Sequence, residues 1–242
     1  DLLAPQAWLE TVAALRDGLL ASPLLAIALI GVVVLLSRQR RIRQDLVATG
    51  KDVGRVTTDR FPLTLKALGW TALLAATWPA LLAAVGAGIL SQPLPVPTSA
   101  MASVLQDGPW RGAAGHVRSV GIALQALALP LFILSSFRLL CLPKGVALVH
   151  FGWTETTCRQ LRRAIAGVIM VVLPAAFFAI LVIRHDSYTT SSGLGVIVFA
   201  TMSLAWSTFF YRVLHPTRGV IGNHFKTHPQ GVLTRTRYLW FP

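Results

Sequence analysis

Five long runs of apolar residues, separated by polar segments, dominate this sequence. They cover residues 19–36, 67–90, 120–142, 164–183 and 194–211. A helix needs about 20 apolar residues to cross a hydrocarbon core about 30 Å thick, and each run is close to that length. The runs are continuous and do not alternate as β-barrel strands do, so we expect helices. A further run begins at Tyr238 and reaches Pro242. The predicted fold class is an all-α, polytopic transmembrane helix bundle of about five spans plus the start of a sixth.

The composition excludes the main alternatives to a membrane protein. Of the 242 residues, 54% are hydrophobic and 13% are charged, whereas soluble domains carry about 25% charged residues. A disordered chain would need far fewer apolar residues. The only two cysteines, Cys141 and Cys158, lack the spacing of a metal or redox motif, and we expect no chemistry from them.

Positive charge alternates between the segments that join the runs. Eighteen of the 22 Lys and Arg residues fall in alternate segments, and the other four fall between them. The positive-inside rule places the eighteen in the cytoplasm, so the N-terminus lies outside. Residues 1–18 are then expected to be the outer end of an upstream region. With the acidic residues included, the net charge is +14 inside and −1 outside.

Two groups of arginines are the candidates for contact with lipid headgroups. One follows the first run as a helical extension of that span. The other lies in a helix that Thr154 caps and that continues into the fourth run. Each basic group near an anionic leaflet contributes about 1 kcal/mol. Membrane lipids are therefore expected partners, and nucleic acid is not, because no aromatic stacking stripe accompanies the charge. The candidate residues are Arg38, Arg40, Arg41, Arg43, Arg159, Arg162 and Arg163.

The centres of the spans carry almost no ionisable groups. Arg138 lies near the inner end of its run, and Gln125 is the most polar residue within a span, suited to an interhelical hydrogen bond or to ion passage. His224 and His228 are four residues apart, but no third ligand is nearby. We therefore predict no metal site, no cofactor, no catalytic residue and no enzyme activity.

Helix-breaking and small residues mark two further features of the spans. Pro79, Pro130 and Pro174 each interrupt a run and are candidate kinks or hinges, although membrane helices commonly carry proline. Ala84 and Gly88 form a small-xxx-small pair, which predicts a close contact with another helix. Pro143 should end the third spanning helix.

Two sequence elements resemble a known family. The first is the stretch 142–153, followed by Cys158-Arg159-Gln160-Leu161-Arg162-Arg163, and the second is 214–220. With the closing 237–240, they resemble the inner-membrane helical region of large, multi-pass (MscK-like) members of the mechanosensitive channel of small conductance superfamily. The resemblance covers residues 19–242 and is strongest from Arg138 onward. Its motif residues are His150, Phe151, Trp153, His215, Pro216 and Arg218.

The resemblance implies a role and a location. Such channels release ions and osmolytes across the bacterial inner membrane on hypo-osmotic stress, so the N-terminus would be periplasmic. The expected partners are membrane lipids, the protein's own pore domain and identical subunits, seven in this family. The family's Gly/Ala-rich pore helix and cytoplasmic β-domain find no counterpart here, because the densest Gly/Ala stretch, 80–88, precedes the matching motifs. Residues 19–242 are then expected to be peripheral helices that sense membrane tension.

Two other classes of protein remain as alternatives. A subunit of a transporter or permease would need a polar or broken-helix site at mid-membrane, and only Gln125 suggests one. A membrane enzyme or a structural scaffold would suit the topology, but the sequence contains no catalytic cluster.

Overall fold

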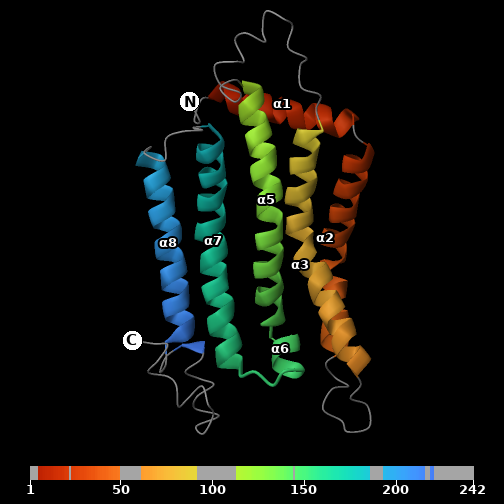
Figure 1. Cartoon of the computed structure of the whole chain (residues 1–242). Coiled ribbons are helices and arrows are strands. Elements are labelled where there is room, and N and C mark those ends of the chain that lie inside the picture. Colours follow the sequence, from red (N-terminus) through yellow and green to blue (C-terminus); the bar gives the residue numbers. More distant parts are fainter. Residues whose placement is uncertain are drawn as a thin grey trace, which may run out of the picture. The chain divides into compact units, whose positions relative to one another are not determined.

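The computed structural model describes residues 5–21, 23–49, 61–91, 113–143, 145–185, 193–215 and 219–220. In these ranges the chain is helical apart from short connections, and no strand occurs. The helices, shown in Figure 1, are α1 (Pro5–Ala21), α2 (Pro23–Thr49), α3 (Phe61–Leu90), α5 (Ala113–Leu140), α6 (Val146–Val149), α7 (Glu155–His185) and α8 (Gly193–Leu214). The all-α prediction is confirmed.

Four helices are long and apolar enough to cross a membrane. Within the part of the chain that the structure describes, these candidate spans are Thr64–Leu90, Gly115–Leu140, Glu155–Arg184 and Gly195–Leu214. They overlap the second to fifth predicted runs, although the span in α5 ends at Leu140, two residues before the predicted end of the third run. The helices extend past the apolar runs because polar residues continue a helix without contributing to hydropathy. The sixth run, from Tyr238, lies outside the described residues.

The first predicted span begins in the wrong place. Leu19 was expected to start it, but α1 continues to Ala21 and a new helix begins at Pro23. Proline lacks a backbone N–H and has a fixed φ, so it favours the first turn of a helix. The apolar part of α2 is therefore shorter than predicted. The arginines follow it within the same helix, and α2 is not among the four candidate spans.

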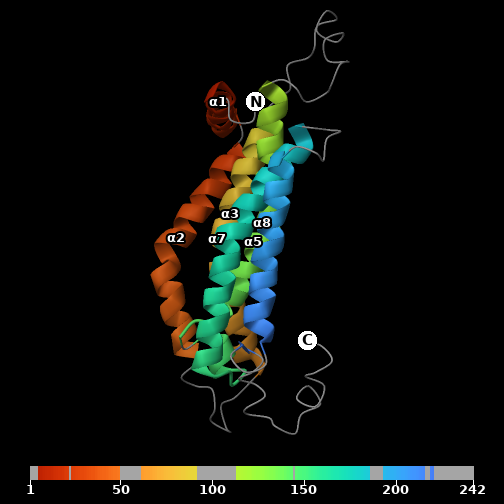
Figure 2. The same cartoon turned by 90° about the vertical axis from the view of Figure 1, so that its left-hand side faces the viewer.

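Hydropathy did not predict α1. Most of this helix falls in residues 1–18, where no element was expected. Trp8 and Leu15 of α1 pack on a cluster built by α3, α5 and α7, and the Trp8 ring meets His116 edge-on with centroids 5.2 Å apart. Figures 1 and 2 together show α1 lying crosswise to the first turns of α5.

The chain divides into two compact units. Unit one comprises Asp1–Leu36, Thr77–Leu131 and Pro174–Ala200, and unit two comprises Ser37–Ala76, Phe132–Leu173 and Thr201–Pro242. Every long helix except α1 contributes one stretch to each unit.

Small residues bring three helices of unit one together. Gly86 of α3 lies so near α5 that an added Cβ would sit 2.7 Å from the carbonyl oxygen of Gly121. An added Cβ at Gly88 would come still closer to the side chain of Leu25 on α2. Ala84 is buried as well, so the predicted close contact of the small-xxx-small pair is confirmed. The Gly/Ala-rich stretch of α3 is therefore a packing surface.

The core of unit two gathers around α6. Val146 packs with Ala67 of α3, while Ala147 packs with Cys141 and Cys158. The chain turns sharply before α6, where Gly145 N donates to Leu142 O at 2.8 Å. The helix before this turn ends at Leu140, as the proline at position 143 predicted.

Candidate functional site

Most of the described positive charge belongs to unit two. Of the thirteen Lys and Arg residues that the structure describes, ten lie in this unit, accompanied by two acidic residues, Asp45 and Glu155. All seven predicted headgroup arginines are among the ten. Arg162 is half-buried and the other six are exposed. The fold thus gathers into one unit the charges that the sequence distributes over three segments.

The arginines of α2 are exposed around one buried apolar residue. The helix continues unbroken through Arg38, Arg40, Arg41 and Arg43, which confirms the predicted helical extension. Ile42 is buried among them, whereas all four guanidinium-bearing side chains are exposed. The apolar side chain is therefore buried, while the four cations are exposed and can meet a charged surface.

The arginines of α7 follow a well-formed helix start. Thr157 N donates to Thr154 Oγ1 at 3.3 Å, so Thr154 is the N-cap that the sequence predicted. Glu155 lies in the first turn, where its negative charge suits the helix dipole. Its carboxylate pairs with Arg159 at 3.0 Å, an exposed i,i+4 contact that contributes about 0.2–0.5 kcal/mol.

His150 joins α6 to α3. Its Nδ1 and the hydroxyl of Thr64 are hydrogen-bonded at 2.9 Å, across 86 residues of sequence. The His150 N–H donates to Val146 O at 2.9 Å, which closes the turn of α6. The first residue of the motif therefore has a positioning role in unit two.

The two aromatic residues of the motif project outward around a glycine. Gly152 has φ +64°, a left-handed conformation that costs other residues about 1–2 kcal/mol. This turn lets Trp153 N donate to Ala147 O at 3.0 Å. Phe151 is 54% exposed and Trp153 is 42% exposed. Exposed aromatic rings beside spanning helices are typical of the membrane–water interface.

The second motif is described only in part. His215 is half-buried and its ring meets the Tyr211 ring edge-on, with centroids 5.4 Å apart. Gly219 N donates to His215 O at 2.8 Å, which ties the two ends of the motif together. Pro216 and Arg218 lie outside the described residues, as do His224 and His228.

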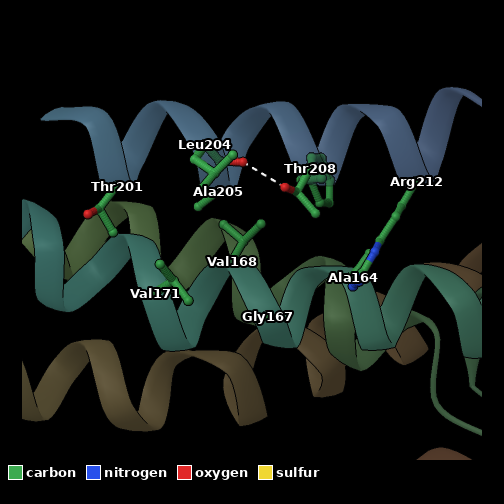
Figure 3. A pocket seen from close by; sticks show the side chains of 10 residues that line it. Ala164, Gly167, Val168, Val171, Thr201, Leu204, Ala205, Thr208 and Arg212 are labelled. Carbon is green, nitrogen blue, oxygen red and sulfur yellow. Dashed lines mark hydrogen bonds between the residues drawn. The ribbon is translucent and has the colours of Figure 1, made fainter. Parts of the chain in front are cut away.

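An open groove runs between α7 and α8 within unit two. Figures 1 and 2 show these helices side by side, and Figure 3 shows the groove from close by. Its volume is about 290 Å³. The α7 wall includes the small residues Ala164 and Gly167, and the α8 wall includes Leu204 and Ala205. Small side chains on one helix leave the space that the groove occupies.

The groove is apolar along its length and cationic at one end. The hydroxyl of Thr208 donates to Leu204 O at 2.8 Å, so it is satisfied within its own helix (Figure 3). Arg212, in the last turn of α8, reaches toward Ala164 at the end of the groove (Figure 3). The site suits an apolar chain with an anionic group at one end, and it offers no group for covalent catalysis.

The two cysteines meet, which the sequence did not predict. Cys141 and Cys158 are both buried and pack together in one cluster. Burial, reinforced by the neighbouring thiol of Cys158, raises the pKa of Cys141 to about 12. No spacing motif pairs these residues, because only the turn through α6 brings them together.

The three predicted hinge prolines lie where the compact units divide. Pro79 is two residues inside a unit boundary of α3, Pro130 is one residue from the boundary in α5, and Pro174 is the boundary residue of α7. Each proline lacks the N–H that would bond the carbonyl four residues earlier. The helices therefore have a missing hydrogen bond near the division.

The described residues hold no cluster of potential metal ligands. No group of three or more His, Cys, Asp or Glu side chains in those ranges is placed to hold a metal ion. Gln125 is exposed on α5, and its Cγ lies near Gly86 of α3, where an added Cβ would be 2.9 Å from it.

The comparison with protein families agrees with these features. The family model described as mechanosensitive ion channel inner membrane domain 1 matches residues 22–106 and 88–242. No curated protein and no solved structure matches the chain significantly. The matched ranges together span nearly all of the chain, and the family is one of channels and not of enzymes. The chain therefore belongs to the inner-membrane domain family of mechanosensitive ion channels.

Proposed function

We propose that this chain forms the peripheral, tension-sensing helices of a mechanosensitive channel that opens on hypo-osmotic stress. Family membership favours this role over a transporter or permease subunit. The observation that carries the proposal is the uncovered apolar surface of α8. Only 6% of the most apolar stretch of α8 is buried, compared with 44% in α3. Such a helix needs lipid or another subunit around it.

The groove beside α8 supports a response to tension. Helices that pack loosely change their tilt or spacing at small cost, and bilayer thinning changes helix energy by fractions of a kcal/mol per Å of mismatch. Summed over several helices and a ring of identical subunits, these energies change the free-energy difference between the closed and open states by a few kcal/mol. We expect seven subunits, as in the related superfamily, and a pore domain elsewhere in the same polypeptide.

The cationic surface of unit two supplies the link to the bilayer. We propose that unit two faces the cytoplasm and that its exposed arginines hold the helix ends at the headgroup plane. The prolines at the unit boundaries then act as hinges, because a helix with a missing hydrogen bond bends there at the lowest cost. Anchored ends and bendable spans turn a change of bilayer thickness into a change of helix geometry.

Patch-clamp recording of the full-length channel tests this proposal. Arg38, Arg40, Arg41 and Arg43 are replaced together by glutamine, which removes up to about 4 kcal/mol of headgroup attraction at about 1 kcal/mol each. We expect the tension at half-maximal opening to rise. The matched variant replaces the same four residues by lysine, which keeps the charge and should keep the threshold. An unchanged threshold in the glutamine variant, at normal expression, would contradict the anchoring role.

A further inference from the structure

Two thiols from different elements meet at the connection between α5 and α7. Cys141 follows the last residue of α5, and Cys158 lies in the first turns of α7. Each is 3% exposed, and the two residues pack in the same cluster. Together with Ala147 of α6 they form one apolar cluster. The fold thus holds two reducing groups in contact, although 17 positions of sequence separate them.

A small cavity lies beside the two cysteines. Its volume is about 30 Å³, and both cysteines line it together with Leu148, Arg159 and Arg162. One water needs about 10–15 Å³ by this kind of measure, so the cavity has room for about two waters or one molecule of hydrogen peroxide. Arg159 and Arg162 also line this cavity, and the positive charge of Arg162 acts against burial by favouring the thiolate form.

We propose that Cys141 and Cys158 are a modification site, at which a peroxide oxidises the two thiols to a reversible intrachain disulfide. The Cys158 thiolate attacks one peroxide oxygen, the O–O bond breaks, and the departing hydroxide takes a proton to leave as water. The Cys141 sulfur then gives up its proton and attacks the sulfenic sulfur. The S–S bond forms, the S–O bond breaks, and a second water leaves. The thiols lose two electrons and two protons, and the peroxide gains them.

The disulfide ties the end of α5 directly to the start of α7. Both helices are candidate spans, and the reduced chain connects them only through the turn that contains α6. A disulfide would restrict the movement of the end of α5 relative to the start of α7. The effect on gating rests on the proposed function and on the cytoplasmic position of unit two, where reducing thiols keep the pair open until oxidants accumulate.

The positions of the basic residues allow a direct test of the bridge. Trypsin cleaves after Arg138, Lys144 and Arg159, so the two cysteines fall in separate peptides, Leu139–Lys144 and Gly145–Arg159. The full-length protein in native membrane vesicles is treated with hydrogen peroxide, blocked with N-ethylmaleimide and digested without reductant. We expect mass spectrometry to find the two peptides joined, and to find them separate after dithiothreitol. Two singly alkylated or over-oxidised peptides without a joined species would overturn the proposal.

A matched variant separates geometry from chance collision. Cys158→Ser combined with Gln160→Cys keeps one thiol on α7 but moves it by two residues, about 200° around the helix. We expect at least a tenfold lower yield of the joined peptides. An equal yield in this variant would overturn the proposal, since the fold would then not select the pair.

Patch-clamp recording addresses the gating effect separately. The tension threshold is compared before and after peroxide treatment in the unaltered protein and in Cys158→Ser. If the tension threshold shifts only in the unaltered protein, and dithiothreitol restores its original value, oxidation of the two cysteines controls gating. A bridge that forms without moving the threshold retains the modification site and counts against tension sensing by these helix ends.

Discussion

Gly86 shows how a single hydrogen in place of a side chain determines packing in unit one. A Cβ at this position would lie 2.7 Å from the Gly121 carbonyl oxygen, and a backbone atom cannot rotate away. Gly69, in the same helix, has nothing within 4 Å of an added Cβ. Two glycines of α3 therefore have opposite requirements, although hydropathy treats them alike.

Gly86→Ala is expected to destabilise the protein, and Gly69→Ala is the matched control. Overpacking costs about 1–3 kcal/mol, whereas an unobstructed Gly→Ala change in a helix gains about 0.5–1 kcal/mol. Thermal unfolding of the purified protein in detergent should show a lower midpoint for Gly86→Ala and an unchanged or higher one for Gly69→Ala. Equal midpoints would show that α3 and α5 do not approach as closely as described.

At the scale of single helices, α8 is the element whose surroundings matter most. Leu204, near its middle, is 70% exposed, and large apolar side chains such as Phe199 and Phe210 are exposed along the same helix. The structure of one chain therefore leaves this helix without an apolar partner on much of its surface.

Leu204→Asp is expected to impair membrane insertion. A carboxylate at the centre of a lipid-facing helix costs about 2.5–3.5 kcal/mol on the insertion scale. The membrane-inserted fraction, measured by carbonate extraction, should fall, while Leu204→Ala keeps the position apolar and should insert normally. Normal insertion of the aspartate variant would indicate that this face meets water.

The prolines give a prediction about helix bending. Pro174→Ala restores the backbone donor to the carbonyl of Met170 and should stiffen α7, so we expect a higher tension threshold in patch-clamp recordings. Pro62→Ala is the control, because Pro62 is exposed in the first turn of α3, where a proline breaks no helical hydrogen bond. A shift of the same size in both variants would contradict a hinge in α7.

At the scale of the whole molecule, the two compact units differ in charge. Unit two holds ten of the described Lys and Arg residues, and unit one holds three, Arg16, Arg118 and Arg184. The distribution of charge between the two units agrees with the alternation along the sequence. The proposed orientation, with unit two toward the cytoplasm, rests on the positive-inside rule.

Reporter insertions test that orientation. Green fluorescent protein fluoresces inside the cell, and alkaline phosphatase is active only outside the cytoplasm. We expect fluorescence from an insertion between residues 50 and 60 and phosphatase activity from one between 186 and 192. The reverse pattern would overturn the cytoplasmic placement of unit two, while leaving the helix assignments intact.

The sequence alone determined the features that depend on local chemistry. Hydropathy located four of the spans, because each spanning helix must be apolar over its own length. Thr154 was recognised as a cap and Pro143 as a helix end, since both act on neighbouring backbone groups. The resemblance in the motif residues indicated the family that the comparison shows.

Only the tertiary structure decided what depends on residues far apart in sequence. The crosswise α1, the groove beside α8 and the meeting of Cys141 with Cys158 left no periodic or spacing signal. Hydropathy indicates whether a segment prefers lipid or water, but it does not indicate which helices are in contact. The proposed disulfide needs a second cysteine in contact with the first, and the turn through α6 supplies that neighbour.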